Sequence, residues 1–366
     1  MRVTLRWSCA ALLAAGMHCV CYGQNITLNE SQRAYFVRLI KSDREAGSLF
    51  ERVRKQADLA LGSQPNPVRL ISSGGRLQDD PVKLATQESL QDMNKVFSLA
   101  MAFGGTGESS YAAKAKAFIL KWADVNEPSG QPIDETNLEP LFLGYDLTRK
   151  TFSVDERSRA DAWLRRVAEA EISHRDERSG NAINNWNSHR LKIIGMIAFL
   201  LGDRRLIDYS VNGYKRQTAD NLRRDGSSFD FEERDSVRYH CYDLEPLLAL
   251  ARVSAMNGVD LYHYIGPNGA SLPAAVAFAL PFIDGTKTHA EFVHSKVAFD
   301  VKRAEAGESH YQSGRPFEPL EGRKILELDY FFDKSVLPLV TRLYGGKTAK
   351  YPSVNVLLME AEKTGM

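Results

Sequence analysis

The amino-acid sequence predicts an all-α protein in which antiparallel helix hairpins stack and curve into a toroid. Apolar residues recur at three- and four-residue spacing through most of the chain, whereas strand-like alternation is scarce. The connections between helical segments are short and rich in Gly, Pro, Asp and Asn, as in "GGTGESS" and "NEPSGQP". Such short connections favour antiparallel neighbours. A flat helical bundle would have the same periodicity, so the pattern leaves that alternative open.

The helical segments follow one another without a linker that would divide the chain. The first pattern covers residues 31–61, and the next ones cover 92–103, 111–125 and 138–149. Segment 153–172 opens with a capping box, in which Ser153 is followed by Glu156 three residues later. Helical patterns continue at 181–203, 205–222, 238–256, 271–283, 322–333, 335–344 and 354–362. We therefore expect a single helical domain over residues 24–366.

The N-terminus has the pattern of a secretory signal peptide, residues 1–23. Arg2 and Arg6 precede an apolar run that is too short to span a bilayer. Cys21 and Gly23 are small enough for the −3 and −1 positions of a cleavage site. We expect an exported protein, periplasmic or secreted, with no membrane attachment after the signal is removed.

Composition excludes several classes of protein. The chain of 366 residues is 43% hydrophobic and 25% charged, which is normal for a globular fold. Its 47 basic and 46 acidic side chains leave a net charge of +1, which gives no support for nucleic-acid binding. Outside the signal only Cys241 remains, so no intramolecular disulfide can form and a large core must hold the fold. We expect a monomer.

The motifs of several catalytic and cofactor sites are missing from the sequence. There is no G-x-S-x-G, no H-E-x-x-H, no P-loop and no G-x-G-x-x-G after a strand. His289 and His294 are five residues apart, which is not the spacing of a helical ligand pair. The sequence therefore predicts neither a metal site nor a cofactor.

Two polar clusters each lead into an apolar helix. The first is "NNWNSHR", residues 184–190, in which Asn185 and His189 are four apart and share a helix face. The second lies in "DGSSFDFEERDSVRYHCYDLEPLLALA", residues 225–251, with Arg234 at the helix entrance and Tyr239 and Tyr242 on one face. Taken singly, such residues are usually caps, core residues or solvated charges. Two clusters of matching character predict one shared cleft.

These residues carry a resemblance to a known group. "NNWNSHR" followed by "DGSSFDFEERDSVRYHCYDLEPLL" resembles the alginate lyase superfamily of polysaccharide lyases, whose members fold as incomplete α/α toroids. Residues 111–147 and 285–300 also look like segments of that group, so the resemblance covers most of the mature chain. Family five has His directly after the second Asn, where this chain has Trp186. The pattern is closer to more distant families, such as family thirty-eight.

The resemblance implies catalytic roles for four residues. Asn185 resembles the Asn that neutralises the substrate carboxylate, Arg234 resembles the active-site Arg, and Tyr239 resembles the catalytic Tyr. His189 would take the histidine role from one turn further on. The implied reaction is β-elimination of a uronate-containing polysaccharide such as alginate or glucuronan. Donors must neutralise the carboxylate beside C5, a base must take the C5 proton, and an acid must protonate O4.

Several other residues are candidates to bind this acidic polysaccharide. Trp186 could stack on a pyranose ring, and Tyr242 could reach the cleft beside Tyr239. A cation such as Arg234, or His240 or His189, could lower the pKa of Tyr239. Cationic candidates for binding neighbouring carboxylates are Arg76, Arg190, Lys287 and His289.

Two other functions remain open from the residues alone. A glycoside hydrolase on an α/α scaffold needs two carboxylates flanking the bond, and Asp230, Glu232, Glu233 and Asp235 offer carboxylates. A non-catalytic exported polysaccharide-binding protein is the other alternative.

Overall fold

The chain forms sixteen α-helices over the part that a computed structural model describes, residues 25–364. The predicted signal peptide, residues 1–23, lies outside these residues. The first eight helices are α1 (Glu30–Ser42), α2 (Arg44–Leu61), α3 (Pro81–Thr106), α4 (Ser109–Val125), α5 (Pro132–Glu135), α6 (Glu139–Thr148), α7 (Val154–Ser173) and α8 (Asn185–Leu201). The others are α9 (Arg204–Asn221), α10 (Phe229–Arg234), α11 (Val237–Met256), α12 (Leu272–Ile283), α13 (Ala298–Glu305), α14 (Arg323–Asp329), α15 (Leu337–Leu343) and α16 (Val354–Glu362).

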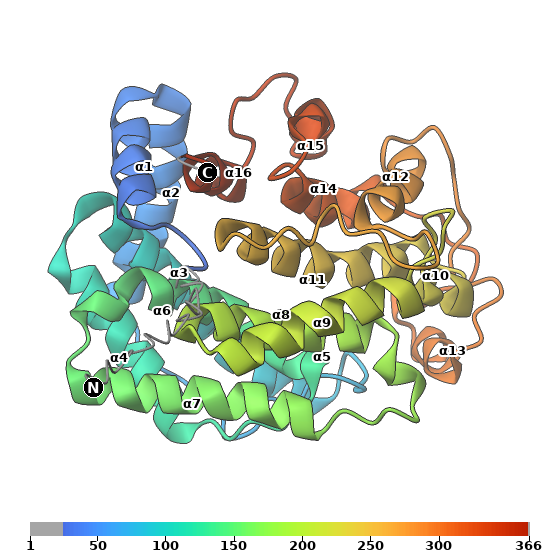
Figure 1. Ribbon diagram of the computed structural model, residues 1–366, viewed down its shortest axis with the longest axis horizontal. Helices are drawn as coiled ribbons and strands as arrows, with labels where there is room; N and C mark the ends of the chain where they lie inside the picture. The colour runs from blue at the N-terminus through green and yellow to red at the C-terminus, as the bar shows by residue number, and fades with distance from the viewer. Residues whose placement is uncertain (1–24, 365–366) are drawn as a thin grey trace, which may run out of the picture.

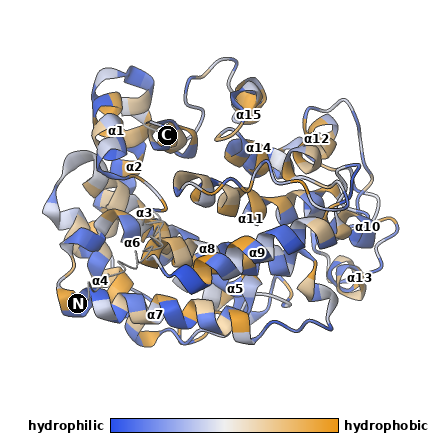
Figure 2. Cartoon of the chain, viewed as in Figure 1, coloured by the Kyte–Doolittle hydropathy of each residue, from blue (hydrophilic) through white to orange (hydrophobic). Residues whose placement is uncertain are grey.

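The helices form an inner and an outer layer. In the inner layer α3 packs on α6, α6 on α8, α8 on α11, and α11 on α14. Helices α4, α7, α9 and α12 pack against these from outside, and α8 and α11 run side by side through the middle of the molecule (Figure 1). Hydrophilic and hydrophobic residues alternate along α7 and α9 (Figure 2), as expected for helices with one face in solvent. In contrast, α8 is buried along almost its whole length.

Caps decide where several helices begin and end. The predicted capping box of Ser153 and Glu156 is present at the start of α7. The helical pattern of residues 31–61 is divided into α1 and α2 at Asp43, whose carboxylate accepts hydrogen bonds from the first turn of α2. Helix α8 ends at Gly202, which adopts the left-handed conformation with φ of 66°.

The two ends of the described chain are tied into the layers. The backbone N–H groups of Ile26 and Thr27 both donate to Asp146 Oδ2 on α6, at 2.9 Å each. Helix α16 packs on α1 and α2, and the Tyr330 hydroxyl after α14 donates to Glu360 on α16. The described residues form only isolated β-bridges and no strand ladder.

No helix in the described part of the chain combines the length and the apolar character needed to cross a bilayer.

Candidate active site

A cavity of about 700 Å³ opens where the N-terminal ends of α8 and α11 meet. Its wall brings together the two polar clusters that the sequence singled out. Asn185 and Trp186 come from the first turn of α8, Arg234 ends α10, and Tyr239 and Tyr242 lie on one face of α11. The segment after α12 adds Phe299, Arg303 and Tyr311 from the other side. The prediction of one cleft shared by both clusters agrees with this arrangement.

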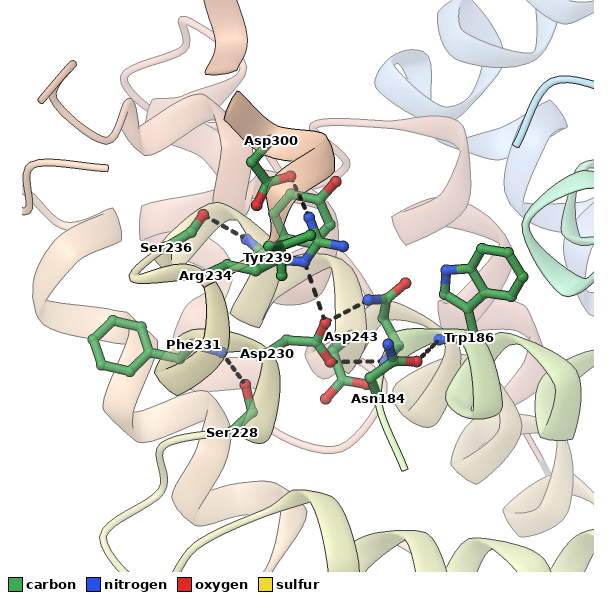
Figure 3. A network of polar contacts seen from close by, with 12 residues as sticks. Asn184, Trp186, Ser228, Asp230, Phe231, Arg234, Ser236, Tyr239, Asp243 and Asp300 are labelled. Carbon is green, nitrogen blue, oxygen red and sulfur yellow. Dashed lines mark hydrogen bonds and ion pairs between the residues drawn. The ribbon is translucent and has the colours of Figure 1, made fainter. Parts of the chain in front are cut away.

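A buried carboxylate connects the two clusters below the cavity (Figure 3). Asp230 on α10 accepts a hydrogen bond from the backbone N–H of Asn185 at 2.7 Å and another from the Asn185 side-chain amide. Arg234 Nε lies 3.9 Å from Asp230 Oδ1, while Arg234 Nη1 pairs with Asp300 on α13. Burial raises the pKa of Asp230 to about 6, although Arg234 opposes this. At neutral pH Asp230 is therefore ionised and holds Asn185 and Arg234 together.

The sharp turn between α10 and α11 sets the positions of Arg234 and Tyr239. Asp235 adopts the left-handed conformation with φ of 48°, and Ser236 then caps α11 by accepting from the backbone N–H of Tyr239 at 3.1 Å. As a result the Arg234 guanidinium lies 3.8 Å from the centre of the Tyr239 ring. Arg234 pairs with Asp300 through Nη1 and also lines the cavity.

The Tyr239 hydroxyl lies in a cluster that sequence reasoning missed. Arg303 Nη1 donates to it at 3.0 Å and to the Tyr311 hydroxyl at 2.8 Å, and the two hydroxyls are 3.1 Å apart. Arg303 and Tyr311 lie in "KRAEAGESHY", which carries no motif, and only the path of the chain after α12 brings them to the cavity. Arg238, also missed, lines the same cavity and is adjacent to Tyr239 in "RYHCY", which was a usable signal.

Burial decides the protonation state of Tyr239. We expected a neighbouring cation, with Arg234 as the first candidate, to lower the pKa of this phenol. Arg234 and Arg303 do act in that direction, but burial is the larger effect and the pKa of Tyr239 is raised. Tyr239 is therefore a neutral phenol at neutral pH, which can donate a proton but is not a pre-formed phenolate.

His189 lies in the wall of a second cavity, of about 750 Å³, which adjoins the first. Ile133, Tyr242 and Glu245 line both cavities, and the His189 ring packs on Tyr242 with 4.5 Å between ring centres. His189 Nδ1 is hydrogen-bonded to Thr136 Oγ1 at 2.8 Å, and Nε2 is buried without a partner among the described residues. Burial, together with the charges of Lys192 and Lys324, lowers the pKa of His189 well below its usual value. The protonated imidazole that we considered is therefore not the resting form.

The other polar residues at the start of α8 have structural partners. Asn184 caps the helix by accepting from the backbone N–H of Trp186 at 2.9 Å. Asn187 donates to Gln217 at 2.7 Å, and Ser188 donates to the buried Asp243 at 2.6 Å. In "NNWNSHR", then, Asn185, Trp186 and His189 line cavities, and the rest hold the helix in place.

Five of the predicted substrate-binding residues do not line either of these cavities. Arg190 is buried and pairs with Glu171, with 3.2 Å between Nε and Oε2. His240 is buried between Ser228 and the carbonyl of Ala275. The remaining three are His289, which contacts Asp235, Lys287, which is exposed beside Phe282, and Arg76, which pairs with Asp80. The structure therefore places none of these five residues in the walls of the two cavities: four have protein partners, and Lys287 is exposed outside both linings.

The carboxylates proposed for a hydrolase are also outside the first cavity. Glu232 pairs with Arg223, Glu233 with Lys296, and Asp235 with His289. The carboxylates that do line it are Glu245 and Glu321, and each of them is held in an ion pair, with Lys324 and Arg315 respectively. In residues 25–364 no group of three or more His, Cys, Asp or Glu is arranged to hold a metal ion.

Comparison with known families identifies the chain. The family model described as alginate lyase matches residues 45–289, about two thirds of the sequence. The chain belongs to the alginate lyase family. It is a polysaccharide lyase, and the alternatives of a glycoside hydrolase and of a non-catalytic binding protein are not supported. Among curated proteins, no sequence matches the chain.

Solved structures support the same fold. An alginate lyase from Bacteroides ovatus is similar with a TM-score of 0.70 and 16% identity, over 92% of this chain and 99% of the other. Alginate lyase A1-III from a Sphingomonas species has a TM-score of 0.57 and 20% identity, over 72% of this chain and 80% of the other. A Tyr-to-Phe variant and a His-to-Ala variant of that enzyme have each been solved with a tetrasaccharide. The α/α toroid predicted from the sequence is confirmed, and the flat bundle is excluded.

Proposed function

We propose that this alginate lyase-family protein cleaves a uronate polysaccharide by β-elimination in the first cavity and leaves an unsaturated uronate end. The observation that carries the proposal is the position of the Tyr239 hydroxyl. Tyr239 belongs to a cavity wall that also includes Arg234, Asn185 and the half-buried Trp186. An acid, a carboxylate binder and a surface for stacking a sugar ring are therefore together in one space.

The residues divide the chemistry as follows. The Arg234 guanidinium and the Asn185 amide bind the uronate carboxylate and stabilise the negative charge that spreads onto it as C5 loses its proton. Tyr239 is neutral, so it can give its proton to O4 while its oxygen takes the proton from C5. Arg303 donates to the Tyr239 oxygen and steadies it while both protons move. Trp186 supports the ring of a neighbouring sugar.

A product assay tests this proposal. Wild-type protein is incubated with mannuronan, guluronan, glucuronan and uncharged glucans, and the ultraviolet absorbance of the unsaturated uronate is followed together with new reducing ends. We expect both signals to rise in parallel on at least one uronan and on no glucan. New reducing ends without ultraviolet absorbance would show hydrolysis and would refute the proposal. We also propose that the enzyme is exported, which N-terminal sequencing of the mature protein would test.

A further inference from the structure

The second cavity differs from the first in its charges. Three arginines, Arg234, Arg238 and Arg303, line the first cavity, where they pair with Asp300, Glu321 and Glu308 respectively. Only two carboxylates, Glu245 and Glu321, belong to that wall, so its lining carries a net positive charge. The second has two lysines, Lys192 and Lys324, and each is already paired with a carboxylate of the same wall. Lys192 Nζ bonds to Glu139, and Lys324 Nζ lies 2.8 Å from Glu245 Oε2. The four charges cancel.

Such a wall does not favour a uronate carboxylate. An incoming anion would have to share the two lysines with Glu139 and Glu245, and it would be repelled by both carboxylates. Glu139 is fully ionised at neutral pH, because the neighbouring lysines lower its pKa to about 2 in spite of its burial. A buried anion without a cation of its own is costly.

The α3 side of the second cavity offers groups that suit sugar hydroxyls. Gln87, Gln91 and Asn94 are four and three residues apart, so they share one face of α3, and all three are exposed and line the cavity. Each amide carries both donors and an acceptor, as a hydroxyl requires. Phe97 lies one turn further along the same face and provides an aromatic surface for the C–H face of a sugar.

The two cavities adjoin at Tyr242. This residue, together with Ile133 and Glu245, belongs to both walls, so a chain whose uronate lies at Tyr239 can place an adjoining sugar against α3. We propose that the second cavity is a subsite for an uncharged sugar, and that the preferred polysaccharide carries a neutral hexose next to the uronate at the cleavage site. That both sugars belong to one substrate chain rests on the proposed function.

Binding to an inactive variant separates this inference from the proposed function. Tyr239→Phe protein is titrated calorimetrically with an oligosaccharide alternating glucuronate and glucose, and with oligoglucuronate of equal length. We expect the alternating oligosaccharide to bind about tenfold more tightly or better, because the all-uronate chain must place a carboxylate beside Glu139 and Glu245. Equal or tighter binding of oligoglucuronate, or no binding of either, would overturn the inference.

A matched pair of variants on α3 locates the effect. Asn94→Ala, in the Tyr239→Phe background, should weaken binding of the alternating oligosaccharide about threefold to tenfold, the worth of one neutral hydrogen bond. Glu88→Ala changes an exposed residue of α3 that does not line the cavity, and it should leave both affinities unchanged. An Asn94→Ala affinity equal to that of Glu88→Ala would contradict the assignment of α3. Absence of an unsaturated product from wild-type protein, with the binding preference intact, would instead refute only the proposed function.

Discussion

Replacing Tyr239 with Phe tests the proposed acid directly, because the change removes one oxygen and keeps the ring. The ring contacts that hold Tyr239 remain, since the Arg234 guanidinium lies over its face at 3.8 Å and Phe292 packs on it with 6.0 Å between ring centres. What is lost is the hydroxyl's contacts with Arg303 and Tyr311. Arg303 keeps its bond to the Tyr311 hydroxyl, so we expect a stability loss of only about 1 kcal/mol.

Turnover should respond far more strongly than stability. General acid–base catalysis contributes about two to four orders of magnitude, which corresponds to roughly 3–5.5 kcal/mol of activation free energy. The substrate carboxylate is bound by other groups, so KM should change little. The assay compares kcat and KM for wild type, Tyr239→Phe and Tyr242→Phe by ultraviolet absorbance, with thermal denaturation as the folding control. Tyr242 lines the same cavity and is the matched control, with a milder expected effect.

The reasoning would be refuted if Tyr239→Phe kept near-normal turnover while Tyr242→Phe or His189→Ala abolished it. The acid–base role would then belong to the residue whose loss is decisive. A Tyr239→Phe protein that fails to fold would show that the hydroxyl contacts with Arg303 and Tyr311 hold the segment after α12 in place.

Further predictions concern charge, backbone and metal dependence. Wild-type kcat should fall as the pH is lowered through about 6, where Asp230 protonates, and Asp230→Asn should remove this limb. Asp243→Asn is the comparison and should leave the limb in place, because burial raises the pKa of Asp243 well above its usual value. Since the pKa of Asp230 is raised on folding, its contribution to the free energy of unfolding is present below about pH 4 and is lost as the pH rises through about 6. In denaturant titrations, Asp230→Asn should flatten this dependence of the unfolding free energy on pH. Gly130→Ala should cost about 2–5 kcal/mol of unfolding free energy, because φ is +72° and the new Cβ would lie 2.4 Å from the backbone oxygen of Ala170. Gly75 has the same φ but open space around it, so Gly75→Ala should cost only about 1–2 kcal/mol. Cys241→Ala should keep most activity and lose about 1 kcal/mol, since this buried thiol packs as a small apolar group. Activity should survive exhaustive chelation, and a loss restored by a single metal would count against a metal-independent reaction.

Local patterns were enough to predict the helices and one half of the site. Hydrophobic periodicity reports which face of a helix is buried, so the longer helices were anticipated, and the Ser153 capping box was located to the residue. The short helices α5, α10 and α13 were not predicted, because four to eight residues are too few to show a helical period. Asn185, Trp186, Arg234, Tyr239 and Tyr242 lie near helix starts, where a short polar run in the sequence becomes a short stretch of cavity wall.

The other half of the site depends on contacts between distant parts of the chain. Arg303 reaches Tyr239 across 64 residues of sequence, and Asp300 reaches Arg234 across 66. No local sequence pattern indicates these long-range contacts. The same holds for two predicted residues that lie outside both cavities: Arg190 and His240 have the chemistry of a binding site, but they bond to partners elsewhere in the chain, Glu171 and Ser228.

The stereochemistry of the sugar gives a last prediction about the base. In mannuronate and glucuronate the C5 proton and O4 lie on the same side of the ring, so one hydroxyl can serve both atoms. In guluronate, the C5 epimer of mannuronate, they lie on opposite sides, and a second group is needed. His189 is the unprotonated candidate, but its Nε2 is buried in the second cavity wall. We therefore expect mannuronan and glucuronan linkages to be cut and guluronan to be resistant, with His189→Ala causing only a modest loss on mannuronan.

Initial rates on the three homopolymers, measured with the same protein preparation, decide this point. Guluronan cleaved as fast as mannuronan would mean that a base reaches the ring from the side opposite Tyr239. If His189→Ala then abolished guluronan cleavage and spared mannuronan cleavage, the base would be His189, and the ring of Tyr242, which packs on it, would have to move aside during binding. If cleavage of neither polymer depended on His189, a syn elimination through Tyr239 alone would account for mannuronan cleavage. The base acting on guluronan would then lie elsewhere in the first cavity.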